Sequence, residues 1–148
     1  MFEAETSNSS TSARLRGRQL ATYDADWTGT YTTAVKNQGY CGSCWAFSTV
    51  EQVESDTMRL LDEDFTLSTQ QLTSCDTGNS GCNGGWTTTA YDYIEQVGGL
   101  VQESAYPYVS GATGLSYSCD TDATENPLVV VTNYYQYYTE QALSLIHI

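Results

Sequence analysis

Basic side chains are scarce in this chain. Its 148 residues include five lysines and arginines against 18 aspartates and glutamates, for a formal net charge of −13. Nucleic-acid binding requires lysine and arginine at the phosphates, and docking on an anionic membrane requires them at the lipid headgroups. We therefore expect neither a nucleic-acid partner nor a membrane partner. A chain this acidic repels itself less where carboxylates are partly protonated, which fits an acidic compartment.

Long apolar segments are also missing. No stretch reaches the roughly 18 consecutive apolar residues of a transmembrane helix. Residues 1–20 are rich in serine and threonine and lack the apolar core of a signal peptide. The protein is then either cytosolic or a sequence whose true N-terminus is not included. With 40% hydrophobic and 12% aromatic residues, the chain can still form one ordinary domain with a packed core.

Histidine occurs once, as His147, which weighs against a metal site. A zinc site would need a second close cysteine pair, but six residues separate Cys75 from Cys82 and no histidine lies near them. A redox role for Cys41-x-x-Cys44 would need a strand–helix–strand context, and that pattern is absent. We expect no metal and no cofactor.

The most informative segment of the chain is residues 35–48, VKNQGYCGSCWAFS. It contains a glycine-rich turn, then Cys41 and Cys44, then an amphipathic run that starts at Cys44. This order can place the Cys44 thiol on the first turn of a helix, where unpaired N–H groups and the helix dipole favour the thiolate. A thiolate is a strong nucleophile near neutral pH, so Cys44 is the candidate nucleophile.

Hydrophobic periodicity predicts helices at about residues 44–61, 68–72 and 86–97. Ser68 and Gln71 have the form of a capping box at the start of the second helix, and Gly98-Gly99 ends the third. The β-branched run 128–132 predicts a strand, and residues 139–143 resemble the opening of another helix. The apolar faces of the first and third helices are expected at Phe47, Val50, Val53, Met58 and Leu61, and at Ala90, Tyr93, Ile94 and Val97.

Four segments in order resemble the papain-like cysteine peptidases of the cathepsin type: QGYCGSCWAFS at 38–48, LSTQQL at 67–72, GCNGG at 81–85 and YPY at 106–108. The resemblance covers about residues 26–143. It implies the α+β papain-like fold, with a mainly helical left domain at 21–126. Residues 127–148 would be the truncated start of the right β domain, and residues 1–20 the end of a propeptide or a linker.

The resemblance also implies roles for individual residues. Cys44 would attack the scissile carbonyl, and the Gln38 amide would bind the oxyanion beside the N–H group of Cys44. Gly84 and Gly85 would pair with an extended peptide, and Trp86 would border the pocket for the second residue before the cut. Taken alone, Gln38 would be interpreted as a polar loop residue, and Trp86 could equally be a core aromatic residue at a helix start. Residues of the same substrate cleft include Gly42 and Ser43.

Five cysteines leave several bonding patterns open, because four of them can form two disulfides in three ways. The family resemblance implies one of these patterns, Cys41 with Cys82 and Cys75 with Cys119. In that pattern Cys44 keeps a free thiol.

The catalytic base that such an enzyme needs is not evident in the sequence. In the family, a histidine and then an asparagine follow the cysteine by about 130–150 residues. His147 and Asn133 come too early for these roles. We therefore expect a partial sequence that is inactive by itself.

The function predicted from the sequence is thiol-dependent hydrolysis of peptide bonds, by an endopeptidase or an exopeptidase. The substrate would be a peptide or protein, the protein a monomer made as a zymogen, and its location a lysosome-like vacuole or the exterior. The alternative is a non-catalytic relative that serves as a disulfide-stapled binding module. The intact pair of Gln38 and Cys44 argues against this alternative.

Overall fold

A computed structural model describes residues 26–136 and 138 of the chain. The expected propeptide end or linker at 1–20, the helix opening at 139–143 and His147 lie outside the described residues. The elements in chain order are α1 (Cys44–Leu61), α2 (Thr69–Cys75), the 3-10 helix η1 (Gly81–Asn83), α3 (Thr87–Val97), α4 (Ser110–Thr113) and the 3-10 helix η2 (Asp122–Thr124).

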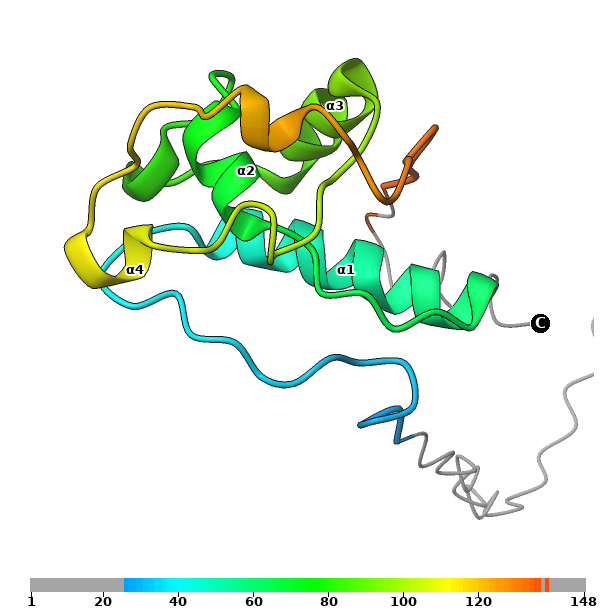
Figure 1. Ribbon diagram of the computed structural model, residues 1–148. Helices are drawn as coiled ribbons and strands as arrows, with labels where there is room; N and C mark the ends of the chain where they lie inside the picture. The colour runs from blue at the N-terminus through cyan, green and yellow to red at the C-terminus, as the bar shows by residue number, and fades with distance from the viewer. Residues whose placement is uncertain (1–25, 137, 139–148) are drawn as a thin grey trace, which may run out of the picture.

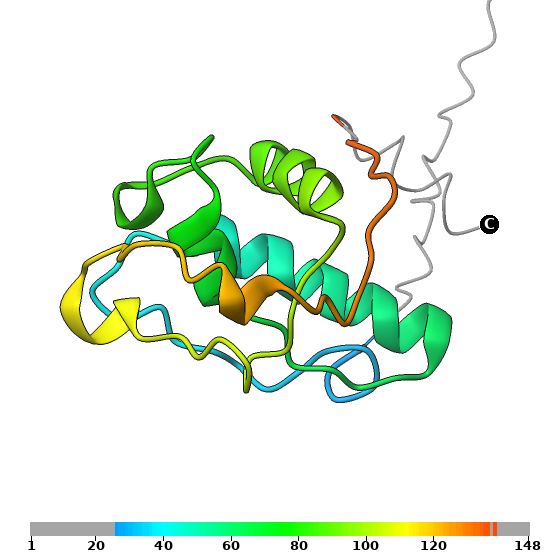
Figure 2. The same ribbon diagram turned by 45° about the horizontal axis from the view of Figure 1, so that its top comes forward.

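The long helix α1 is the centre of the fold. Helices α2 and α3 pack against it, and residues 26–43 run along α1 on the side away from α3 (Figures 1 and 2). The buried core lies between α1 and these two helices. Its fully or almost fully buried members are Trp45, Ala46, Val50, Val53, Leu67, Leu72, Ala90, Ile94 and Leu100.

Helix α1 has the predicted bounds, but its buried face differs in part from the predicted one. Val50 and Val53 are buried as expected, whereas Leu61 is 64% exposed because the last turn of α1 projects past α3 (Figure 1). Thr49 and Thr57 are buried instead, and each hydroxyl donates to a backbone carbonyl one turn earlier. These internal hydrogen bonds make the threonines acceptable in the core, which hydrophobic spacing could not indicate.

Helix α2 begins as predicted and runs three residues further than predicted, to Cys75. The Ser68 hydroxyl oxygen caps it by accepting a hydrogen bond from the Gln71 N–H group at 3.0 Å. The Gln71 side chain does not return to the Ser68 backbone. It donates to the Gly99 carbonyl at 3.1 Å and accepts from the Val101 N–H group at 2.9 Å, so it ties α2 to the segment after α3.

Helix α3 ends at Gly98 as predicted, because Gly98 adopts a left-handed conformation with φ of 84°. Ala90 and Ile94 are buried and Tyr93 is half-buried. Val97 was expected on the same face, but its side chain is 44% exposed. The buried face of α3 therefore includes fewer residues than the apolar face predicted from the sequence.

The strand predicted at 128–132 is not formed within the described residues. Only one isolated bridge occurs there, between Val129 and Leu100, and a second isolated bridge joins Leu67 to Gln102. A strand needs several successive backbone hydrogen bonds to a neighbouring segment. The backbone of residues 128–132 is hydrogen-bonded only to the backbone of Leu100 among the described residues. The described part of the molecule is consequently helical.

None of the described helices combines the length and the apolar character that a membrane span requires.

Candidate active site

The free thiol of Cys44 lies at the first residue of α1 and is exposed to solvent. At this position of a helix the backbone N–H group has no hydrogen-bond partner within the helix, so it can donate a hydrogen bond to a bound ligand. Ser43 precedes it as the N-cap residue and is fully buried. The hydroxyl of Ser43 is hydrogen-bonded to the Tyr108 hydroxyl at 2.7 Å, so this side chain faces the interior.

Three contacts tie the start of α1 to η1. A disulfide joins Cys41 to Cys82. The Gly42 N–H group donates to the Cys82 carbonyl at 2.9 Å, and a Cβ atom at Gly42 would lie only 2.5 Å from that oxygen. The Trp45 indole N–H donates to the Gly81 carbonyl at 3.0 Å. These contacts hold the Cys44 thiol in a fixed place relative to the 81–85 loop.

A second disulfide joins Cys75 at the end of α2 to Cys119. The two bonds are the pairs that the family resemblance implies, and Cys44 is the one free cysteine of the described residues.

The side chain of Gln38 lies close to the same place. Its Nε2 donates to the Cys41 carbonyl at 2.9 Å, which folds residues 38–41 into a closed turn. Gln38 and Cys44 line one open cavity of about 520 Å³ along α1. The structure thus brings the two predicted catalytic residues to one hollow. Its other lining residues come from the 32–36 segment and one face of α1: Thr32, Lys36, Phe47, Ser48, Glu51, Gln52 and Ser55.

The segment of Gly84, Gly85 and Trp86 follows η1. Gly84 has φ of 111°, a backbone conformation that residues with a side chain rarely adopt. A Cβ atom at Gly85 would lie 2.5 Å from Asn79 Oδ1 and 2.8 Å from Trp45 Cδ2, so only glycine fits. The backbone N–H and C=O groups of Gly85 make no hydrogen bond to another described residue. Trp86 is 77% exposed and is no part of the core.

Asn79 fixes this segment, and sequence reasoning missed it. Its Oδ1 accepts from the Trp86 N–H group at 2.7 Å, and its Nδ2 donates to the Trp86 carbonyl at 3.2 Å and to Asp76 Oδ2 at 2.6 Å. A side-chain amide that pairs with both backbone groups of one residue acts as a short strand partner. The only signal in the sequence is the turn composition of 76–79, which does not indicate the partner.

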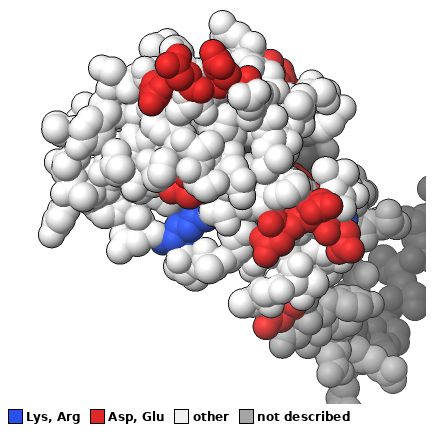
Figure 3. Space-filling view, in the orientation of Figure 1, with Lys and Arg blue, Asp and Glu red and all other residues white. Residues whose placement is uncertain are grey.

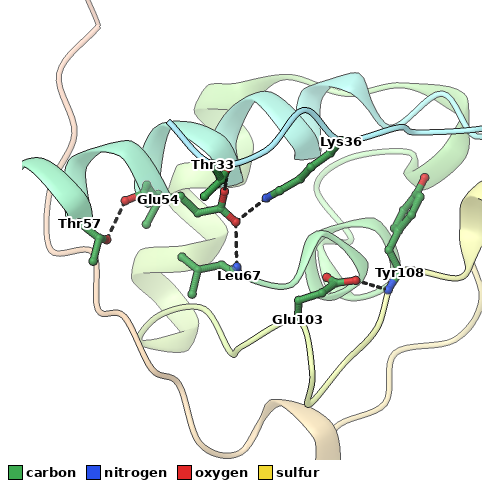
Figure 4. Close-up of polar contacts among 8 residues, drawn as sticks. Thr33, Lys36, Glu54, Thr57, Leu67, Glu103 and Tyr108 are labelled. Carbon is green, nitrogen blue, oxygen red and sulfur yellow. Dashed lines mark hydrogen bonds and ion pairs between the residues drawn. The ribbon is translucent and has the colours of Figure 1, made fainter. Parts of the chain in front are cut away.

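A buried carboxylate holds the segment that leads to Gln38. Glu54 on α1 is fully buried, and Figure 4 shows its partners converging from three directions. It accepts from the Thr33 hydroxyl at 2.7 Å and from the Leu67 N–H group at 2.8 Å, and it forms an ion pair with Lys36. The carboxylate is therefore fully satisfied, and it fastens residues 33–36 to α1.

A second carboxylate, Glu103, supports the other side of the site. Its Oε1 accepts from the Tyr108 N–H group at 2.7 Å (Figure 4). Burial raises the pKa of the Glu103 carboxyl, and the hydrogen bond from Tyr108 opposes this rise.

Acidic groups dominate the charged surface. On the face seen in Figure 3 the acidic side chains form separate groups, and little basic surface lies among them. The lysines and arginines within the described residues are Lys36 and Arg59. Arg59 forms an exposed ion pair with Asp56 at 3.1 Å. In the same part of the chain no three His, Cys, Asp or Glu residues gather as a metal would require, and no histidine faces Cys44.

Comparisons with known proteins agree with this geometry. The family model described as "Papain family cysteine protease" matches residues 21–147. "Digestive cysteine proteinase 3" of Homarus americanus is 43% identical over 123 residues, which cover 81% of this chain and 37% of that protein. "Cathepsin K" of Mus musculus is 48% identical over 94 residues, which cover 64% of this chain and 27% of that protein.

Solved structures show the same fold. The Amb a 11 cysteine protease, a ragweed pollen allergen in its proform, matches with a TM-score of 0.63 at 38% identity, over 70% of this chain and 31% of that one. Bromelain from Ananas comosus, in complex with the E64 inhibitor, matches with a TM-score of 0.64 at 33% identity, over 73% of this chain and 48% of that one. The predicted fold class is confirmed, with the helical domain as the matching part. The chain spans less than half of the length of each of these relatives.

Proposed function

This chain belongs to the papain family of cysteine proteases, and we propose that it supplies the nucleophile and the oxyanion donors for hydrolysis of a peptide bond. The observation that carries the proposal is the position of Cys44. Its free, exposed thiol stands at the first residue of α1 and opens into the cavity that Gln38 also lines. The relatives named above are cysteine proteases, in agreement with a thiol nucleophile at this place.

The proposed reaction begins with attack of the Cys44 thiolate sulfur on the scissile carbonyl carbon. A carbon–sulfur bond forms, and the carbonyl π electrons move to the oxygen. The backbone N–H group of Cys44 and the Nε2 of Gln38 then donate to this oxyanion. Collapse expels the amine, which takes up a proton, and water hydrolyses the remaining thioester. The base that moves these protons comes from outside the described residues.

The substrate is proposed to be an extended peptide or protein segment that lies against Gly84 and Gly85. The backbone groups of Gly85 have no partner among the described residues, so they can pair with a peptide backbone as in strand addition. The absence of a side chain lets the two backbones approach closely. Gly42 is proposed to border the same cleft, and exposed Trp86 to contact the second residue before the cut. The sequence also put Ser43 forward as a cleft residue, but Ser43 is fully buried and has no surface to offer a substrate.

The setting of the protein belongs to the same proposal. Two disulfides fit an oxidising compartment, such as a lysosome-like vacuole or the cell exterior. We propose a monomer made as a zymogen. The proposed boundaries are 1–20 for the propeptide end or linker, 21–126 for the left domain and 127–148 for the start of the right domain.

Labelling of the full chain with a peptidyl vinyl sulfone tests the nucleophile. We expect one adduct on Cys44, found by mass spectrometry, and none on a Cys44→Ser variant. The rate should be at least tenfold higher than in the denatured chain with its disulfides intact, because binding at the Gly85 backbone holds the reagent beside the thiol, an effect that exceeds roughly tenfold in well-oriented pairs. A Ser104→Ala variant, changed at an exposed serine that does not line the cavity, is the control. Equal rates in the folded and denatured chains would contradict the proposal and favour the non-catalytic binding module.

A further inference from the structure

We propose that Tyr108 is a positioning residue of this active site, because its hydroxyl group holds the Gln38 turn and the residue before Cys44 in one arrangement. The inference rests on the proposed roles of Cys44 and Gln38. It adds a residue that lies 64 or more positions away along the chain and does not touch the reacting atoms.

The contacts of the Tyr108 hydroxyl carry the inference. It donates to the backbone carbonyl of Gln38 at 3.0 Å and is hydrogen-bonded to the Ser43 hydroxyl at 2.7 Å. A phenol has one proton, and a carbonyl oxygen can only accept, so the Tyr108 proton goes to Gln38. The Ser43 hydroxyl is then the donor to Tyr108. One oxygen atom thus joins the residue proposed to bind the oxyanion to the N-cap of the helix that carries the nucleophile.

Tyr108 is itself held in place. Its ring packs edge to face against Phe47 of α1, with ring centroids 4.9 Å apart and an interplanar angle of 85°. Its N–H group donates to Glu103, and the residues after it are anchored by buried Gln70, whose Oε1 accepts from the N–H groups of Val109 and Ser110 at 2.8 and 3.1 Å. A side chain fixed at its ring and at its backbone can impose a position on its hydrogen-bond partners.

The 38–40 turn lies directly against the segment after Tyr108. The Tyr40 N–H group donates to the Gly111 carbonyl at 2.8 Å. Gly39 has φ of 63°, and a Cβ atom at Gly39 would collide with the Gly111 backbone. A Cβ atom at Gly111 would in turn lie 2.8 Å from the Tyr108 ring. The turn is therefore packed on one side of Tyr108 and hydrogen-bonded to it at Gln38.

Burial raises the pKa of the Tyr108 phenol, and the hydrogen bond from Ser43 opposes this rise. The hydroxyl keeps its proton at neutral pH and remains able to donate to Gln38.

The test compares Tyr108→Phe with Tyr106→Phe in the full chain. Both variants lose one phenol oxygen from the same Tyr-Pro-Tyr segment, but the Tyr106 hydroxyl contacts Ser118 and Asp120 instead of the active site. A peptide aldehyde labelled with ¹³C at its carbonyl is the probe, since addition of the Cys44 thiolate gives a tetrahedral hemithioacetal whose negatively charged oxygen occupies the oxyanion position. Its dissociation constant is measured by NMR.

We expect Tyr108→Phe to weaken the hemithioacetal roughly three- to tenfold, the effect of one neutral hydrogen bond, and Tyr106→Phe to change it less than about twofold. Alkylation of Cys44 by iodoacetamide, which needs no oxyanion donor, should change less than about twofold in both variants. In a Gln38→Ala background, Tyr108→Phe should have a smaller effect than in the native background, because the part of its effect that depends on the Gln38 amide is already lost.

The outcomes separate the inference from the function on which it rests. If the wild-type chain forms no hemithioacetal, the proposed function fails. A second outcome is that wild type forms the hemithioacetal and Gln38→Ala weakens it, but Tyr108→Phe does not. In that case only the role of Tyr108 is overturned. The role of Tyr108 would likewise be overturned if the effects of Gln38→Ala and Tyr108→Phe on hemithioacetal binding were fully additive. Additivity would mean that Tyr108→Phe acts through a general loss of stability, which does not depend on Gln38.

Discussion

At the scale of single residues, the site depends on positions where the addition of one methyl group or the loss of one hydroxyl group changes a packing contact or a hydrogen bond. Gly85 is the clearest of these, because a methyl group there would enter the space of Asn79 and Trp45. We expect Gly85→Ala to lower the free energy of unfolding by about 1–3 kcal/mol, the usual cost of overpacking. Urea denaturation of the full chain measures this change.

A second variant shows where the cost arises. In an Asn79→Ala background, Gly85→Ala should cost less than in the native background, because one of the two colliding side chains is gone. Gly84→Ala is a useful control, since its Cβ atom would meet nothing within 4 Å and only its positive φ opposes the change. Equal costs for Gly85→Ala with and without Asn79 would contradict the packing at this position.

Tyr91 gives a pH-dependent prediction. Burial, and secondarily Asp56, raises the pKa of Tyr91 from 10.0 to about 12. Between pH 10 and 12 the Tyr91 phenol is ionised in the unfolded chain but still protonated in the folded chain. Ionisation therefore favours the unfolded state, and the stability that is fully present below pH 10 is lost as the pH rises to 12. Wild type should therefore lose more stability across this range than Tyr91→Phe does. Parallel slopes of unfolding free energy against pH in the two proteins would count against this effect.

The two proposed catalytic residues could be put forward from the sequence, whereas the residues that hold them in place could not. Cys44 and Gln38 stand six positions apart in one motif, so local spacing was enough to put them forward together. Tyr108, Asn79 and Glu54 act through contacts that depend on the fold. The Tyr108–Gln38 contact joins positions 70 residues apart, and no local pattern indicates such a pair.

At the scale of elements, buried polar side chains join neighbouring segments. Glu54 of α1 binds Lys36 and Thr33 from one segment and the Leu67 backbone from another. Replacement of Glu54 by Leu should cost about 3–5 kcal/mol, because Lys36 remains with an unpaired charge. Chemical denaturation of the variant measures the loss.

The partner substitution provides the check on this ion pair. A double variant, Lys36→Met with Glu54→Leu, should recover the part of the loss that comes from the unpaired Lys36 charge, while the Leu67 N–H group stays without its acceptor in both variants. If the double variant is as unstable as Glu54→Leu alone, the ion pair is not the source of the effect.

The start of α2 allows a comparison of two side chains. Ser68→Ala removes the helix cap and the hydrogen bond from the Ser68 hydroxyl to the Tyr106 carbonyl, and should cost about 1–2 kcal/mol. Gln71→Ala should cost more, since it leaves the buried Gly99 carbonyl and Val101 N–H group unpaired, at about 1–3 kcal/mol each. The order of the two unfolding free energies is the measured quantity. A larger loss for Ser68→Ala would contradict the prediction that Gln71 contributes more to stability than the cap does.

The helices were predicted more successfully than the strand for a physical reason. Local hydrogen bonds and caps decide where a helix runs, so 44–61 could be derived from its own residues. A strand depends on a partner elsewhere, and the β-branched run 128–132 meets only Leu100 within the described part. Sequence spacing also cannot show that Thr49, Glu54 and Thr57 satisfy their polar groups inside the core.

At the scale of the whole molecule, the two disulfides close loops of nearly equal length, with sequence separations of 41 and 44 residues. Loop-closure entropy predicts about 4 kcal/mol of stabilisation from each. Paired replacement of Cys41 and Cys82 by alanine should therefore destabilise the chain about as much as replacement of Cys75 and Cys119. The two variants should differ in the site, since only the first bond fixes the turn before Cys44.

Binding of the labelled peptide aldehyde distinguishes the two bonds. We expect the variant without Cys41 and Cys82 to lose most of its affinity, and the variant without Cys75 and Cys119 to keep it under conditions where both are folded. Equal affinity in the two folded variants would contradict a special role for the bond between Cys41 and Cys82.

The central claim for the molecule is that Cys44 and Gln38 act on the same carbonyl group. The most direct measurement is the ¹³C NMR spectrum of the full chain with the carbonyl-labelled peptide aldehyde, for wild type, Cys44→Ala and Gln38→Ala. We predict a hemithioacetal carbon resonance, distinct from that of the hydrated aldehyde, in wild type, its absence in Cys44→Ala, and roughly 10- to 100-fold weaker binding in Gln38→Ala, the effect of one charge-assisted hydrogen bond. A resonance that persists without Cys44, or an affinity that does not depend on Gln38, would contradict the claim.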